Sequence, residues 1–312
     1  MKVATIRLPG RLCAVRQDGN VFVEIQGFSD IGALVQFPNW KEIAAQASGP
    51  THPVVGADLA PTIPKPGKIM CIGMNYKQHI VERGVPFPDY PTVFAKFSDS
   101  LVGANDYISL PPEDSKADWE GELSVIIGKP ARRIRKEEAE NYIAGYTVFN
   151  DISMRGFQNR SQQWLQGKTW ENSSPLGPVM VTPDELKLDA RIQTKIDGQV
   201  VQDSSIDDLL FDIPQIIAYL SVFTTLQPGD VISTGTPSGV GVAQNPKRFL
   251  VPGEVLETTV EGIGSLKNRI IEEEIVETKA ESLKGLVHSE IRQAIQPEYG
   301  GASKILHRSS SY

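Results

Sequence analysis

Short strand-like runs, separated by Gly and Pro, most limit what this chain can fold into. The 312 residues include 27 Gly and 22 Pro. After residue 67 the apolar or β-branched runs that predict strands are residues 93–97, 121–127, 144–149, 193–196, 199–201, 231–234 and 255–260. Helices are predicted at residues 136–142, 159–164 and 212–223. Strands outnumber helices and do not alternate with them as βαβ units, so we predict an α+β fold rather than an α/β fold.

The sequence pattern of the first 66 residues predicts a small α+β module. Strand-like runs lie at residues 2–6, 11–16 and 20–25, and residues 30–48 are expected to be helical. Three prolines at positions 61, 64 and 66 form a stiff connector that predicts few contacts across it. We therefore divide the chain into an N-terminal module and linker (1–66), a large core (67–271) and a charged tail (272–312). The tail is expected to be partly disordered, with one amphipathic helix near residues 279–296.

Glu120, Glu122 and Asp151 are the strongest chemical signal. Glu120 and Glu122 are two residues apart in a run that becomes β-branched, and strand geometry places such residues on one face. Two ionised carboxylates that close repel each other unless a positive charge lies between them. Asp151 ends another apolar run and can complete an all-oxygen site, which suits Mg²⁺ or Mn²⁺. The alternative is a solvated edge strand with an acidic face.

His79 and Glu82 form a second candidate group. They are three residues apart, so one helical turn makes them neighbours. A carboxylate beside an imidazole raises its basicity and orients it, which suits a general base. An exposed His–Glu contact without function is the alternative.

Lys168, Arg155 and Gln158 supply further polar groups. Lys168 could hold a developing oxyanion, Arg155 a substrate carboxylate, and Gln158 a water molecule. Each could equally be an ordinary surface or structural residue. In the loop Gly235-Thr236-Pro237-Ser238-Gly239, the glycines allow close approach of the backbone to a ligand. The loop lacks the Gly-Lys-[Ser/Thr] ending of a phosphate loop, and a tight turn is the alternative.

Composition excludes several classes of partner. The net charge is −7 and no basic stripe offsets it, so we expect no nucleic-acid partner. No run approaches the roughly 18 apolar residues that span a bilayer, and the first residues lack the apolar region of a signal peptide. We therefore expect no membrane partner and a cytoplasmic location. Two cysteines, far apart, predict neither a disulfide framework nor a zinc site.

Taken in order, these segments resemble the fumarylacetoacetate hydrolase superfamily. The matching motifs are Gly-Met-Asn-Tyr-x-x-His-x-x-Glu from Gly73, Asp-x-Glu-x-Glu-Leu from Asp118, Asn-Asp-Ile-Ser-x-Arg-x-x-Gln from Asn150, Gly-Lys at 167–168, Pro-Leu-Gly-Pro at 175–178 and Gly-Thr-Pro-x-Gly-Val-Gly from Gly235. The resemblance runs from about residue 68 to 270. It implies a mixed β-sandwich or β-roll core and a homodimer.

The resemblance also implies roles for the residues. Glu120, Glu122 and Asp151 would hold the metal, and a mobile lid would bring His79 and Glu82 to it. We assign Tyr76, Arg155, Gly235, Thr236 and Pro237 to substrate binding, and His79, Glu82, Lys168 and Gln158 to catalysis. The chain departs from the family pattern at Gly156, where an acidic residue is common, and at residues 172–174. Residues 83–90 and 172–174 are expected to set substrate specificity.

The implied reaction is metal-dependent cleavage of a carbon–carbon bond in a β-diketo acid, of the acylpyruvate or fumarylpyruvate type, through a metal-stabilised enolate. Similar proteins are the fumarylacetoacetate hydrolase domain-containing proteins and bacterial hydrolases of aromatic catabolism. The same enolate chemistry without an attacking water gives a decarboxylase or keto–enol tautomerase for oxaloacetate-like 2-oxo acids. A silent small-molecule binder is a further alternative, since fold-level analogy does not separate these functions.

Overall fold

The largest sheet in the computed structural model, which describes residues 1–274, has eleven strands. Their order is β4-β3-β2-β1-β13-β11-β10-β16-β5-β6, and β7 pairs with β13. In that order they are β4 (Thr51–Pro53), β3 (Val21–Glu24), β2 (Arg11–Asp18), β1 (Lys2–Leu8), β13 (Ser174–Val181), β11 (Ile143–Asn150), β10 (Gly121–Ile127), β16 (Val231–Ser233), β5 (Ile69–Gly73), β6 (Thr92–Lys96) and β7 (Leu101–Val102).

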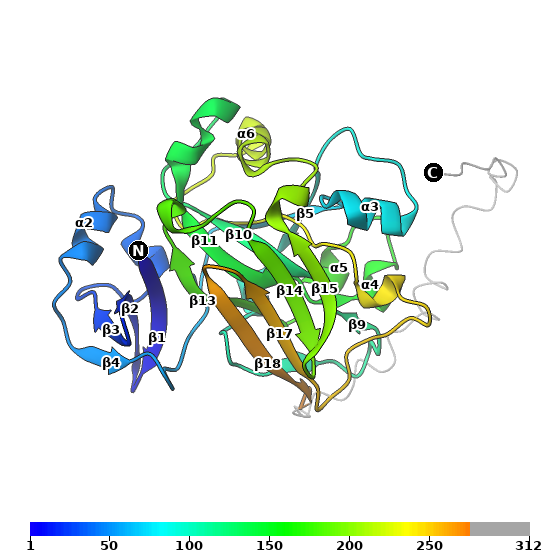
Figure 1. Cartoon of the computed structure of the whole chain (residues 1–312), viewed down its shortest axis with the longest axis horizontal. Coiled ribbons are helices and arrows are strands. Elements are labelled where there is room, and N and C mark those ends of the chain that lie inside the picture. Colours follow the sequence, from blue (N-terminus) through cyan, green and yellow to red (C-terminus); the bar gives the residue numbers. More distant parts are fainter. Residues whose placement is uncertain (275–312) are drawn as a thin grey trace, which may run out of the picture. The chain divides into compact units, whose positions relative to one another are not determined.

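A second sheet packs on the first. It has the order β15 (Gln199–Ser205), β14 (Arg191–Ile196), β17 (Val255–Val260), β18 (Gly264–Glu272) and β8 (Ile108–Leu110). Figure 1 shows β14, β17 and β18 lying across β10, β11 and β13, and contacts join the same strands. A small third sheet pairs β9 (Ala117–Asp118) with β12 (Ser153–Met154). Few helices and mixed, layered sheets confirm the predicted α+β fold with a β-rich sandwich core.

Helices are short in the described residues. The α-helices are α1 (Ile31–Leu34), α2 (Trp40–Ala45), α3 (Lys77–Arg83), α4 (Arg155–Gln158), α5 (Leu165–Lys168) and α6 (Ile213–Phe223). The 3₁₀ helices are η1 (Ser98–Ser100), η2 (Lys136–Tyr142), η3 (Pro183–Glu185), η4 (Ile206–Asp208) and η5 (Gly241–Ala243). No helix within residues 1–274 is long and apolar enough to cross a membrane.

Several predicted elements are confirmed. The strand at residues 121–127 is β10, and the helix at 212–223 is α6, which begins after an Asp212 cap whose side chain accepts a hydrogen bond from the Gln215 N–H. The predicted helix at residues 159–164 is wrong: α4 and α5 lie on either side of it. There the Ser161 hydroxyl bonds to the backbone of Gln163, and such local bonds compete with a helix. The predicted helical stretch 30–48 is split into α1 and α2, with Pro38 between them.

The Pro-rich linker does not keep the N-terminal segment (residues 1–66) apart. Strand β1 pairs antiparallel with β13, with Lys2 opposite Val181 and Val3 opposite Met180. Val3 belongs to the same buried apolar cluster as Phe149 of β11. The expectation of few contacts across the linker is therefore wrong, and residues 1–273 form one compact unit. The boundary at residue 66 stays a prediction, and the predicted tail helix at 279–296 lies outside the described residues.

Candidate metal and active site

Glu120, Glu122 and Asp151 meet where β10 and β11 pair. The antiparallel register sets Gly121 of β10 opposite Asn150 of β11, so the residues that flank this pair come together. One carboxylate oxygen from each of the three acidic residues lies within 4.8 Å of the others. Their relative exposures are 7%, 1% and 0%. Because β10 lies inside the sheet and these carboxylates are buried, the alternative of a solvated edge strand is wrong.

Two buried lysines contact two of the three carboxylates, Glu120 and Asp151. The Lys168 ammonium lies 2.6 Å from Glu120 Oε2 and 2.7 Å from Asp151 Oδ2. The Lys96 ammonium lies 2.7 Å from Asp151 Oδ1 and donates to the carbonyl oxygen of Ile152. Lys96 escaped the sequence analysis, although a lysine inside the apolar run 93–97 is an unusual buried charge. Asp118, which contacts Arg155, was also assigned no role.

The charges divide the three carboxylates into two kinds. Burial alone would raise the pKa of Glu120, but the positive charges of Lys168 and Arg155 outweigh it and lower this pKa strongly. Glu122 has no cationic partner among the described residues, and burial together with the negative charges of Asp151 and Glu120 raises its pKa well above the usual value. Its carboxylate accepts hydrogen bonds from the Ser233 hydroxyl and, at 2.9 Å, from the Gly235 N–H. One more positive charge at this place would stabilise ionised Glu122.

The donor set fits a hard divalent cation. Three carboxylates converge, and neither His nor Cys is among the group. All-oxygen ligation suits Mg²⁺, Mn²⁺ or Ca²⁺ better than the softer transition metals. The unneutralised Glu122 is the structural observation that supports a cation here, because the two lysines already compensate Asp151 and Glu120. These residues are therefore suited to hold the metal that the motifs predict.

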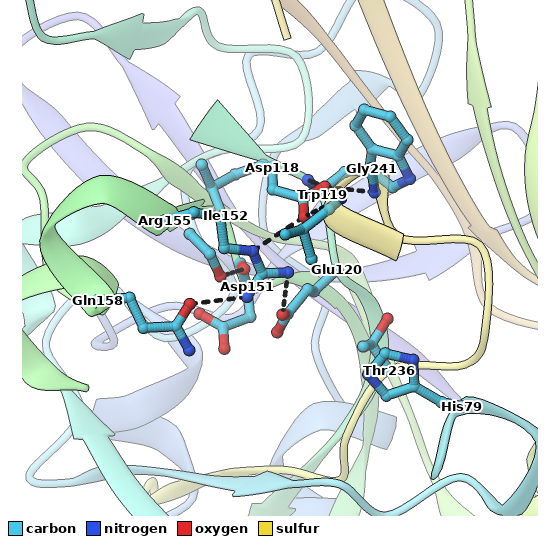
Figure 2. Close-up of polar contacts among 12 residues, drawn as sticks. His79, Asp118, Trp119, Glu120, Asp151, Ile152, Arg155, Gln158, Thr236 and Gly241 are labelled. Atoms are coloured by element: carbon cyan, nitrogen blue, oxygen red, sulfur yellow. Dashed lines mark hydrogen bonds and ion pairs between the residues drawn. The ribbon is translucent and has the colours of Figure 1, made fainter. Parts of the chain in front are cut away.

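Arg155 links the acidic group to Gln158. Its Nε donates to Asp118 Oδ2 at 2.9 Å, Nη2 contacts Glu120 Oε1 at 2.6 Å, and Nη1 donates to Gln158 Oε1 at 2.8 Å. Figure 2 shows the guanidinium lying between these three side chains. With the Gln158 oxygen committed to Arg155, the amide nitrogen of Gln158 is the group left to meet a ligand. The predicted contact of Arg155 with a substrate carboxylate stays a prediction.

The loop after β16 contributes backbone and one side chain. Gly235 has φ 105°, and a Cβ there would lie 2.9 Å from both Asn75 Cβ and the Ile72 carbonyl oxygen, so glycine is required. Thr236 Oγ1 donates to the Gly121 carbonyl oxygen at 3.0 Å and accepts from Gln202 at 2.8 Å. Pro237 presents its carbonyl oxygen to Gln202 as well. The loop is thereby tied to the start of β10.

His79 lies on α3, where it is 6% exposed and pairs with Glu82. The His79 Nδ1 and Glu82 Oε2 atoms are 2.9 Å apart, and the other oxygen of Glu82 accepts from the Gly239 N–H at 2.9 Å. Glu82 thus joins the helix to the loop after β16. His79 and Thr236 line the same cavity. Tyr76, which we assigned to substrate binding, is buried in the apolar core, where burial raises its pKa and its hydroxyl has no partner among the described residues.

Several of these side chains line one cavity of about 260 Å³. Its polar lining consists of His79, Arg83, Glu120, Glu122, Arg155, Gln158, Asn159, Lys168 and Thr236. Its apolar lining consists of Ile72, Met74, Phe94, Trp164, Val240 and Val242, with Gly73. The structure therefore brings together most of the predicted site residues. The predicted site residues outside this lining are Tyr76, Glu82, Asp151, Gly235 and Pro237, and residues 172–174 are outside it too.

Gly156 departs from the family pattern, and the structure shows what lies there instead. Both carboxylate oxygens of Asp114 are 2.7 Å from the place that a Cβ on Gly156 would take. Asp114 accepts hydrogen bonds from the N–H groups of Lys116 and Phe157, each at 2.9 Å. A carboxylate from another part of the chain thus lies where a side chain on residue 156 would begin.

Gly156→Ala is expected to lower the free energy of unfolding by about 1–2 kcal/mol, because Asp114 must move and its hydrogen bonds weaken. Urea unfolding of the two proteins measures the difference. In an Asp114→Ala background the same change should cost much less, because the obstacle is gone. An equal cost in both backgrounds would show that Asp114 is not the cause.

Residues 68–271 match the family described as fumarylacetoacetate (FAA) hydrolase, C-terminal. The chain is 42% identical over 217 residues to the mitochondrial oxaloacetate tautomerase fahd2 of Xenopus laevis, covering 68% of each chain. It is also 42% identical over 217 residues to the human mitochondrial oxaloacetate tautomerase FAHD2A, covering 68% of this chain and 69% of that one.

Two solved structures are similar as well, and each covers 88% of this chain and 100% of its own. One is the fumarylacetoacetate hydrolase of the psychrophilic Exiguobacterium antarcticum, at 28% identity and a TM-score of 0.79. The other is the 5-carboxymethyl-2-hydroxymuconate delta-isomerase of Mycobacterium smegmatis, at 31% identity and a TM-score of 0.73. The names of these relatives thus include a hydrolase, an isomerase and tautomerases.

Proposed function

Because this chain belongs to the fumarylacetoacetate hydrolase family, we propose that it is a divalent-cation-dependent tautomerase of an oxaloacetate-like 2-oxo acid. The observation that carries the proposal is the His79–Glu82 pair, whose imidazole lines the same cavity as Glu120 and Glu122. Relatives named as oxaloacetate tautomerases support it. It was the second candidate in the sequence analysis, and hydrolysis of a β-diketo acid, the first candidate, is not confirmed.

His79 is the proposed proton carrier. Because Glu82 accepts a hydrogen bond from Nδ1–H, the neutral ring keeps its lone pair on Nε2. That atom takes a proton from C3 of the keto acid. The C3–H electron pair forms the C2=C3 double bond, and the C2=O π pair moves to the oxygen. The oxygen then receives the proton from Nε2, which balances the reaction and restores the base.

The carboxylates and lysines prepare the electrostatics of the cavity. A divalent cation, which we propose to be Mg²⁺ or Mn²⁺ held by Glu120, Glu122 and Asp151, would supply Lewis-acid stabilisation of negative charge on the 2-oxo oxygen. Lys168 adds a buried positive charge at the cavity wall, although it also contacts Glu120 and Asp151. The Gln158 amide nitrogen is positioned by Arg155 to donate to a substrate oxygen. These groups orient a small anionic acid.

One observation keeps the hydrolase as the second candidate. Phe94 and Trp164, whose ring centroids are 5.4 Å apart in an edge-to-face pair, form an apolar wall of the cavity. An acyl group could pack against such a wall. Carbon–carbon cleavage would also require a water that His79 activates, whereas tautomerisation requires only the proton transfer.

Removal of the divalent cation is expected to abolish turnover of oxaloacetate enol to its keto form. The decay of the ultraviolet enol absorbance should be accelerated by the Mg²⁺-loaded protein, and EDTA should return it to the uncatalysed rate, because the charge on the 2-oxo oxygen then lacks its stabilisation. The same preparation is assayed on an acylpyruvate, by loss of the diketone absorbance. If the protein cleaves the acylpyruvate but does not convert the enol, the hydrolase is the better assignment and the tautomerase is wrong. If it acts on neither compound, a non-catalytic small-molecule binder is favoured.

We also propose a homodimer, which the family resemblance supports and which sedimentation analysis would test. The expected cytoplasmic location stays a prediction, and the relatives from Xenopus laevis and human are named as mitochondrial.

A further inference from the structure

The inner cationic groups of the cavity already have acidic partners. Lys168 contacts Glu120 and Asp151, and Arg155 contacts Asp118 and Glu120. Each therefore compensates charges of the protein itself. A substrate that carries a second carboxylate brings a negative charge for which these groups supply no additional cation.

Arg83 is the exception among the cationic residues of the lining. It is exposed at the last residue of α3, four residues after His79, and both residues line the cavity. Residues four apart on a helix share a face, so the base and the guanidinium face the same space. Within residues 1–274 the Arg83 side chain makes no ion pair with an acidic residue.

We propose that Arg83 binds the distal carboxylate of a dicarboxylate 2-oxo acid and makes the enzyme prefer dianionic substrates. This inference rests on the proposed function and deepens it. The 2-oxo end of the acid faces Glu120, Glu122 and Gln158, and the acid then extends toward α3, where Arg83 is the cation without a protein partner. A guanidinium can bind a carboxylate through two parallel hydrogen bonds, which a neutral ester would not match.

The matched substrates are oxaloacetate and its 4-methyl ester, which differ in the distal charge. For Arg83→Gln we expect KM for oxaloacetate to rise about tenfold, while the KM for the ester and both kcat values change little. The estimate takes the lower end for a charge-assisted hydrogen bond, because the site is exposed and screened by salt. Arg83→Lys should recover part of the preference.

Lys77→Gln is the control variant. Lys77 is the first residue of α3, is exposed and does not line the cavity, so this variant loses one positive charge from the same helix. We expect the preference for oxaloacetate over its ester to be unchanged. If Lys77→Gln lowers the preference as much as Arg83→Gln does, the preference depends on the total positive charge of α3 and not on a contact with Arg83. The proposed contact is then overturned.

A binding measurement separates this inference from the proposed function. The probe is 3,3-difluoro-oxaloacetate, which has no hydrogen at C3 and cannot enolise. Calorimetric titration of the Mg²⁺-loaded protein should give a Kd about tenfold weaker for Arg83→Gln than for the wild type. Equal Kd values overturn the role of Arg83 even if the tautomerase is active. If Arg83→Gln binds the probe more weakly than the wild type but the wild type turns over neither substrate, Arg83 remains a carboxylate-binding residue. The proposed tautomerase activity is then overturned.

Discussion

Replacing Asp151 by asparagine is expected to lower the free energy of unfolding by about 3–5 kcal/mol, measured by urea denaturation without added metal. Asp151 is 0% exposed, and the ammonium groups of Lys96 and Lys168 each lie 2.7 Å from its carboxylate. Asparagine keeps the volume of the side chain but removes its charge. Lys96 then has no acidic partner among the described residues, and the cost is that of a buried, uncompensated charge.

Two further variants test this explanation. Lys96→Met in the Asp151→Asn background should recover much of the stability, because the uncompensated ammonium group is gone. Asp203→Asn breaks the exposed ion pair with Arg191 and should cost no more than about 1 kcal/mol. Similar losses for Asp151→Asn and Asp203→Asn would show that burial of the pair does not determine the effect.

His79→Asn is expected to lower kcat for enol–keto conversion about 10²- to 10⁴-fold, because the proposed proton carrier is removed. The Mg²⁺ affinity should change little, since His79 is not one of the three carboxylates that converge on the cation site. Stopped-flow decay of the enol absorbance gives kcat, and calorimetric titration gives the affinity for Mg²⁺.

His52→Asn is the matched control for His79→Asn. His52 also pairs with a glutamate, since its Nε2 lies 2.8 Å from Glu24 Oε1, but it belongs to β4 and does not line the cavity. Its replacement should leave kcat unchanged. If His79→Asn keeps the wild-type kcat, another group carries the proton and the proposed mechanism fails.

The acidic site could be predicted because its signals are local. Glu120 and Glu122 are close in sequence, and Asp151 ends the neighbouring apolar run, so strand periodicity and one antiparallel pairing suffice to bring them together. Lys96, which compensates the charge of Asp151, could not be predicted in this way. Lys96 comes from β6, four strands from β11 across the sheet, and only the complete fold brings its side chain to Asp151.

The fold was also predictable in part, where its signals are local in the sequence. Alternating or apolar runs indicated most strands, and the Asp197-Gly198 turn joins β14 to β15 with φ of 48° and 80°, as such a hairpin requires. Strand β13 was missed because Pro175 and Pro178 interrupt its pattern. The helix predicted at residues 159–164 was wrong because the Ser161 hydroxyl bonds to the backbone of Gln163, and such local bonds compete with a helix.

The pairing of β1 with β13 shows that the segment matched by the family model is not the whole hydrogen-bonded sheet. The family match begins at residue 68, yet β13 lies between β1 and β11 in the sheet. A chain that started at residue 68 would carry every motif of the site and still expose β13 as an open edge, with the apolar surface that Val3 and Ile31 cover. The first 66 residues therefore cover the edge of β13, and a protein shortened to begin at residue 68 would be prone to self-association.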